Sequence, residues 1–163
     1  MSATRLFFLP FASLIVSAAL CADAPSFSSY PATVSFDMKG AAAVDLSSSP
    51  KARRYAAALR SAAAKGPNFA GAFTLVTWGC GVACQEIAVV DARNGRVIFP
   101  KAVKLNAYQA VTDSTKPIDY QLSSRMLVLA GAPNDGDETG LFYYEWTGED
   151  LRPIAKQLRS WPR

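Results

Sequence analysis

The chain has 163 residues, of which 50% are hydrophobic and 18% are charged, a composition that excludes a disordered polypeptide and suits one packed domain. Its net charge is +4, but the 17 basic residues never form a long run, so the sequence lacks the basic stripe of a nucleic-acid-binding protein. The chain has no histidine, which excludes Ser-His-Asp and Cys-His catalysis and a histidine-based zinc site.

Residues 1–22 predict a signal peptide, with a positive charge at Arg5 followed by an apolar stretch and small residues. The apolar stretch, residues 6–20, contains a proline and is short for a membrane span. Cys21 would be the lipidated residue of a lipoprotein, but the bulky leucine before it disfavours that alternative. We therefore expect residues 23–163 to form a single periplasmic or secreted domain without a membrane span.

The first elements after the signal peptide are a strand and a helix. Residues 33–37 alternate apolar and polar side chains, which predicts a strand. Ser49 and Pro50 suit the N-cap and the first position of a helix that ends at Gly66 and Pro67. Its apolar face, which we expect to cover a sheet, consists of Tyr55, Ala58, Leu59 and Ala62.

The rest of the chain predicts strands. Residues 73–78 and 86–92 form two strands joined by a turn at Gly79–Cys84, and Asn94-Gly95 predicts a two-residue hairpin to a third strand. Later elements are strands at 96–99, 118–122, 125–130 and 141–146, and a short strand or helix at 151–158. The predicted fold class is α+β, an antiparallel sheet of about six or seven strands with one main helix packed on it.

The turn between the first two of these strands contains Cys80 and Cys84, which we expect to form a disulfide in an oxidising compartment. No second cysteine or histidine pair exists that would complete a metal site. A bridged, glycine-containing loop loses little entropy when it binds a partner, so it is a candidate recognition loop; the alternative is a purely structural staple. The candidate partner-binding residues are Trp78, Gly79, Cys80, Gly81, Val82 and Cys84.

Three other segments have a functional and a structural interpretation. The run Gly66–Gly71 could shape a pocket wall or simply connect the helix to a strand. The acidic segment could hold calcium, supply an acid/base pair, or be an ordinary turn; it contains Asn134, Asp135, Asp137 and Glu138. The aromatic strand could form a carbohydrate or peptide platform or pack in the core; it contains Tyr143, Tyr144 and Trp146. We expect no catalytic residues, no metal and no cofactor.

The segment Asn68–Gln85 reads NFAGAFTLVTWGCGVACQ and resembles a family of uncharacterised secreted proteobacterial proteins with the motif NFAGxF…WGCGxxCQ. The resemblance implies export. Members of that family often carry His at the position of Ala72, so any role of that histidine does not transfer to this chain.

The order of strand, short disulfide loop, strand and hairpin also resembles the periplasmic inhibitor-of-vertebrate-lysozyme family. In that family a small disulfide loop enters the active-site cleft of lysozyme. The family loop is one residue longer and carries a histidine, so its inhibitory contact does not carry over residue by residue.

These features predict a periplasmic binding or inhibitor protein, not an enzyme, that presents a rigid disulfide loop to a protein partner such as a cell-wall hydrolase or a toxin. One alternative is an envelope structural or small-ligand-binding module. Another is an envelope hydrolase that uses the carboxylates of Asp135 and Asp137.

Overall fold

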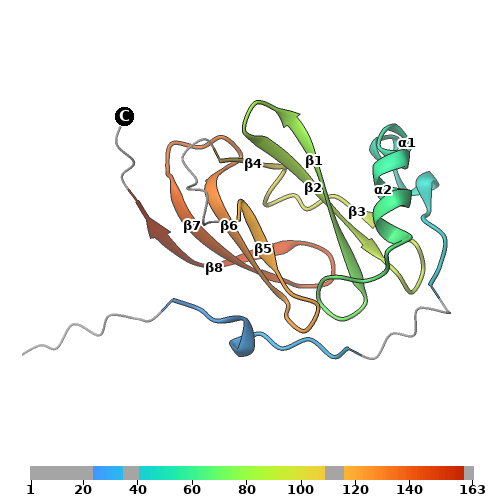
Figure 1. Cartoon of the computed structure of the whole chain (residues 1–163), viewed down its shortest axis with the longest axis horizontal. Coiled ribbons are helices and arrows are strands. Elements are labelled where there is room, and N and C mark those ends of the chain that lie inside the picture. The colour runs from blue at the N-terminus through green and yellow to red at the C-terminus, as the bar shows by residue number, and fades with distance from the viewer. Residues whose placement is uncertain (1–23, 35–40, 109–115, 160–163) are drawn as a thin grey trace, which may run out of the picture.

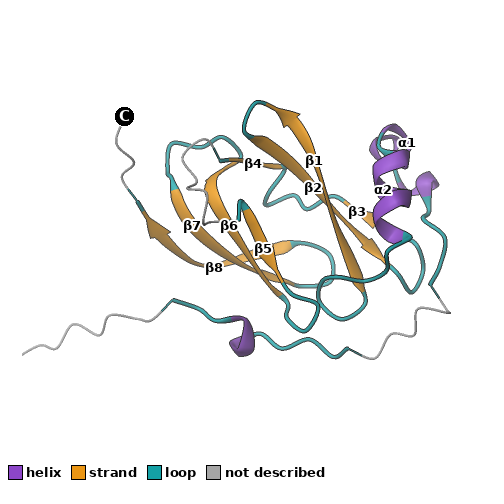
Figure 2. Ribbon diagram, in the orientation of Figure 1, coloured by secondary structure: helices purple, strands orange, loops and turns teal. Residues whose placement is uncertain are grey.

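The computed structural model describes residues 24–34, 41–108 and 116–159. It confirms the α+β fold class, because an antiparallel sheet dominates the domain and one short helical region packs against it (Figures 1 and 2). The predicted signal peptide, residues 1–22, lies outside the described residues. Within the described ranges, no helix has the length and apolar character needed to cross a membrane.

Within the described residues the sheet has eight strands, all paired antiparallel, where the sequence predicted about six or seven. Its main path is β1-β2-β4-β6-β7-β8, with β3 beside β2 and β5 beside β6. The strands are β1 (Phe73–Gly81), β2 (Cys84–Asp91), β3 (Val97–Ile98), β4 (Leu105–Ala107), β5 (Ile118–Tyr120), β6 (Met126–Pro133), β7 (Gly140–Trp146) and β8 (Leu151–Leu158).

The main core lies between the two ends of this sheet. Leu75 of β1 and Trp146 of β7 belong to one buried cluster although three strands separate β1 from β7 in the strand order, so the sheet curls around its own core. Alternation places Tyr144 and Trp146 on the core side and Tyr143 on the opposite side of β7, and all three side chains are buried. The core interpretation of the aromatic strand is therefore confirmed.

Two short helices, α1 (Pro50–Arg54) and α2 (Ala56–Ala63), cover the outer face of β1 and β2. Ser49 caps α1 by accepting a hydrogen bond from the backbone N–H of Ala52, at 3.0 Å, as predicted. The predicted main helix is confirmed, but the backbone leaves the helical conformation at Tyr55, which divides the helix into α1 and α2. The ring of Tyr55 stacks on Trp78 of β1, with the ring centroids 4.3 Å apart, so the residue between the two helices packs against the sheet.

Two further predictions need correction. Thr33 and Val34, the described part of the predicted 33–37 strand, lie in no strand, and the Val34 side chain is 51% exposed. The hairpin at Asn94-Gly95 exists, but its loop has four residues, 92–95, rather than two. The Asp91 carboxylate accepts from the N–H of Arg93 and the Asn94 side chain accepts from the N–H of Arg96, and these local bonds favour the wider turn.

Candidate functional site

The β1–β2 hairpin carries the predicted recognition loop, and its apex is sharper than the sequence predicted. The strands continue to Gly81 and Cys84, which pair with each other, so the turn itself contains only Val82 and Ala83. The predicted turn at Gly79–Cys84 was therefore too long. The apex lies at the top of Figure 1, at the end of two long strands.

A bulge and a disulfide together shape this apex. The strand register shifts between Gly79 and Gly81, which leaves Cys80 as the extra residue of a β-bulge. The predicted disulfide is confirmed: Cys80 bonds to Cys84 across the hairpin, with Cα atoms 5.2 Å apart. Gly81 has φ +147°, a conformation that other residues rarely adopt, so the sequence needs glycine at this position.

The turn presents an apolar side chain to solvent. Val82 is 90% exposed, far more than the other exposed large hydrophobic side chains in the described residues. Ala83 has φ +49°, a strained conformation that costs about 1 kcal/mol for an L-residue. Its carbonyl accepts a hydrogen bond from the N–H of Tyr108, at 2.9 Å, so the segment after β4 supports the apex. The disulfide and this bond hold Val82 in a defined position.

An aromatic cluster supports the hairpin just below its apex, where Trp78 pairs with Glu86. Trp78 stacks on Tyr55 and meets Phe99 edge-on, with the two centroids 6.3 Å apart. The Lys51 ammonium lies 4.9 Å from the Phe99 ring centroid and 2.7 Å from the carboxylate of Glu86 on β2. Trp78 is half-buried, so it supports the hairpin from the strand rather than forming an open contact surface.

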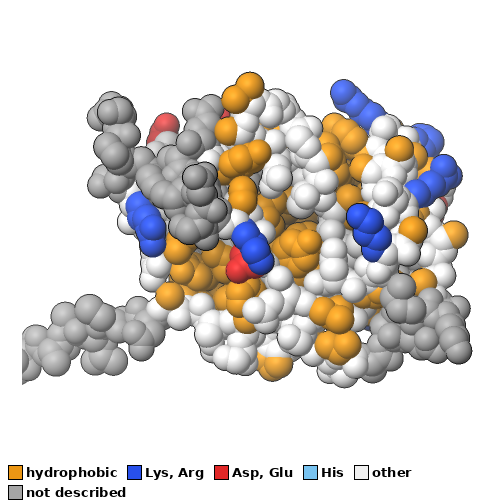
Figure 3. Space-filling model, in the orientation of Figure 1, with side chains coloured by type: hydrophobic (Ala, Val, Ile, Leu, Met, Phe, Trp, Pro, Cys, Tyr) orange, Lys and Arg blue, Asp and Glu red, His pale blue; other side chains and the backbone are white. Residues whose placement is uncertain are grey.

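The helices beside the hairpin form a basic surface that sequence reasoning missed. No acidic residue occurs between Asp45 and Glu86, and the fold gathers the cations of this stretch on α1, α2 and the turn that follows (Figure 3). Among the described residues, only Lys51 of this group has an ion-pair partner. We call this group the basic helix face: Lys51, Arg53, Arg54, Arg60 and Lys65.

The acidic turn between β6 and β7 gives no sign of a metal or catalytic site. Asn134 and Asp135 both have positive φ, and the Asn134 side-chain oxygen accepts from the N–H of Lys104 at 2.8 Å. Glu138 pairs with Lys156 at 2.6 Å. No cluster of three or more potential metal-ligating side chains occurs in the part of the chain that the structure describes. All four predicted side chains are exposed: Asn134, Asp135, Asp137 and Glu138.

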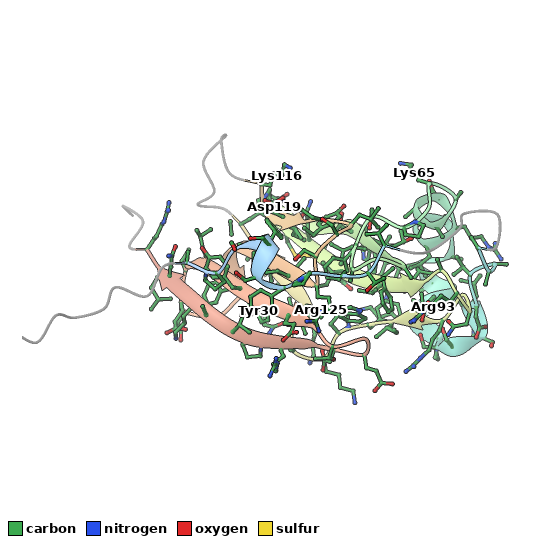
Figure 4. All side chains as sticks on the ribbon, turned by 90° about the horizontal axis from the view of Figure 1, so that it is seen from below. Tyr30, Lys65, Arg93, Lys116, Asp119 and Arg125 are labelled. Carbon is green, nitrogen blue, oxygen red and sulfur yellow. A yellow bond between two sulfur atoms is a disulfide. The ribbon has the colours of Figure 1, made fainter. Side chains whose placement is uncertain are left out.

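An apolar pocket of about 450 Å³ lies on the face of β6 and β7 that points away from the main core. Lys116 and Asp119 lie side by side at its rim, with nitrogen and oxygen 3.6 Å apart (Figure 4). Burial raises the pKa of the Tyr143 hydroxyl, which donates a hydrogen bond to Gln157. The apolar lining includes Phe27, Met126, Val128, Leu141 and Tyr143.

No protein-family model, curated protein or solved structure matches this chain.

Proposed function

We propose that this is a periplasmic or secreted binding protein that inserts the apex of the β1–β2 hairpin into a groove of a protein partner, such as a cell-wall hydrolase or a toxin. The observation that supports the proposal is the 90% exposure of Val82 on an apex closed by a disulfide. Complete burial of a valine side chain contributes about 1.5–3 kcal/mol. Because the apex is already ordered, little of that free energy is lost on binding.

The surroundings of the apex suit such a contact. Helix α2, which carries part of the basic helix face, packs against β1 of the same hairpin, so these charges would attract an acidic partner and accelerate encounter. The resemblance to the inhibitor-of-vertebrate-lysozyme family supports the same mode of binding. In this chain Val82 would take the contact, because the loop has no histidine.

The test is inhibition of a panel of lysozymes and bacterial wall hydrolases by the oxidised protein, the reduced protein and the variant Val82→Asp. Leu158→Asp is the matched control, because Leu158 is an exposed hydrophobic residue, 52% exposed, on the distant strand β8. We expect inhibition of at least one enzyme, a loss of at least tenfold on reduction and in Val82→Asp, and no loss in Leu158→Asp. Equal inhibition by Val82→Asp and Leu158→Asp would contradict the role of the apex.

A second candidate function is the binding of a small apolar ligand, which the pocket above β6 and β7 favours. Its volume of about 450 Å³ falls within the range of small-molecule sites, and its lining is mainly apolar. Native mass spectrometry of the protein purified without denaturation would detect a bound molecule. Val128→Trp should fill the pocket and abolish that added mass, and a mass that persists in this variant would exclude the pocket as the site.

A further inference from the structure

Strand β1 is an edge strand, since β2 is its only strand partner within the described ranges, apart from an isolated bridge between Phe69 and Phe73. The backbone groups of Leu75 point outward from this edge. Its N–H donates to the side-chain oxygen of Asn68 at 2.7 Å, and its carbonyl accepts from the Asn68 amide at 3.2 Å. Outward-pointing backbone groups recur at every second residue of an antiparallel strand, so those of Thr77 and Gly79 face the same open edge.

Within the described ranges, the chain covers only the first half of this edge. Phe69 exchanges two backbone hydrogen bonds with Phe73, at 2.9 and 3.0 Å, and Asn68 covers Leu75. None of the residues that the structure describes bonds to the outward groups of Thr77 or Gly79, and both residues are exposed. An open edge of this kind is a template for another extended chain.

A groove of about 500 Å³ runs along this edge between β1 and α2. Leu75 and Thr77 belong to its β1 side, and the alanines Ala58 and Ala62 of α2 form a low wall that leaves room for a second backbone. Asn68 also lines the groove, so the Gly66–Gly71 run is a pocket wall as well as a connection. Lys65, at the end of α2, lines the groove and points away from the sheet (Figure 4).

Of the basic helix face, Lys65 lines the groove, and its charge favours an acidic chain there. Arg54, Arg60 and Lys65 are exposed and have no acidic partner within the described ranges. If two copies of this chain paired their β1 edges about a two-fold axis, the basic helix faces would approach one another and repel. A segment that carries Asp or Glu would instead be attracted.

We propose that an extended acidic segment of a protein partner adds to the sheet as a strand beside β1. Its backbone would pair with Thr77 and Gly79, and its carboxylates would meet the basic helix face. The inference rests on the proposed function, because it names a second contact that the same partner would make next to the hairpin apex. The two contacts use different residues, so each can fail separately.

The experiment measures backbone amide exchange by NMR in the presence of a blocked synthetic peptide of about nine residues that alternates valine and glutamate. The same peptide with lysine in place of glutamate is the control. We expect the glutamate peptide to slow exchange at the Thr77 and Gly79 amides by at least tenfold and the lysine peptide to leave them unchanged. Unchanged exchange at both amides with millimolar glutamate peptide would overturn the proposal. Protection that rises with protein concentration, without peptide, would instead identify a second copy as the occupant and would also overturn it.

Variants separate the edge from the apex. Thr77→Pro removes an outward N–H and should abolish peptide binding, whereas Thr77→Val keeps the backbone and should bind normally. If Thr77→Pro fails to fold, Lys65→Glu serves instead, with an expected loss of about fivefold in affinity, and Lys104→Glu is the control with the same change of charge on another surface. Equal affinity of Lys65→Glu and Lys104→Glu would contradict the charge argument. Val82→Asp should bind the peptide normally, so a failure of the apex contact would not be mistaken for a failure of the edge.

Discussion

Replacing both Cys80 and Cys84 by serine should lower the free energy of unfolding by about 2 kcal/mol. The bridge joins residues four apart and closes a ring of only five residues, so the chain entropy that it removes from the unfolded state is small. The rest of the hairpin has its own support in the Trp78 aromatic cluster and in the pairing of β2 with β4. We therefore expect the double variant to fold, with a looser apex.

Urea unfolding measures the global effect. With a slope of about 2 kcal/mol per molar urea, the midpoint should fall by about 1 M without a change of slope. Amide exchange measures the local effect, and the Tyr108 N–H, which bonds to the carbonyl of Ala83, should exchange faster in the variant. A loss above about 4 kcal/mol, or failure to fold, would refute the reasoning, because the bridge would then be supporting the whole sheet. Unchanged exchange at Tyr108 would show that the apex does not depend on the bridge.

Two further predictions concern stability. Gly131→Ala should lower the free energy of unfolding by about 3 kcal/mol or more, since Gly131 has φ +145° and a new Cβ would lie 2.2 Å from a carbonyl oxygen of β4. Gly148→Ala should lower it by only about 1 kcal/mol, because Gly148 has φ +98° but its new Cβ would have no atom within 4 Å. Equal losses in urea unfolding would contradict this distinction. Burial alone would raise the pKa of the Asp91 carboxyl, but the hydrogen bonds and charge of Arg93 outweigh burial and lower the pKa. The pair should therefore contribute stability above about pH 4 that is lost as the pH falls further. Asp91→Asn should therefore be less stable at pH 7 and show a flatter decline in stability below pH 4, and an unchanged acid profile would argue against this role of the ion pair.

Local patterns in the sequence predicted the parts of the fold that depend on local physics. The Ser49 cap, the alternation of β7 and the Cys80–Cys84 disulfide follow from neighbours in the chain. The break at Tyr55 and the short strand β4 depend on distant partners. Tyr55 packs on Trp78 of β1, and β4 exists because it pairs with β2 on one side and β6 on the other. The residues of β4 by themselves do not predict a strand that pairs with β2 and β6.

The sequence predicted one part of the candidate site, the disulfide apex, and missed two others, the open edge of β1 and the basic helix face. Its exposed apolar residue, Val82, lies between the two cysteines and was found from the sequence. The open edge at Thr77 was not, because it depends on Asn68 reaching back to Leu75 and leaving the next backbone groups uncovered. The basic helix face had a signal in the sequence, the stretch between Asp45 and Glu86 without an acidic residue, but the sequence did not show that Lys65 lines the groove beside β1.

The two proposed contacts, at the Val82 apex and at the β1 edge, both depend on a rigid end of the β1–β2 hairpin. An added strand beside Thr77 would meet a flexible tip unless the end of β1 were held in place, because a bulge interrupts the ladder at Cys80. The disulfide from that bulge residue to Cys84 restores the connection across the hairpin at the point where pairing is irregular. The bridge is therefore placed where it can stiffen both the exposed valine and the open edge. This arrangement suits a partner that grips the hairpin along its length, and it explains why so small a ring, with little effect on global stability, would matter for binding.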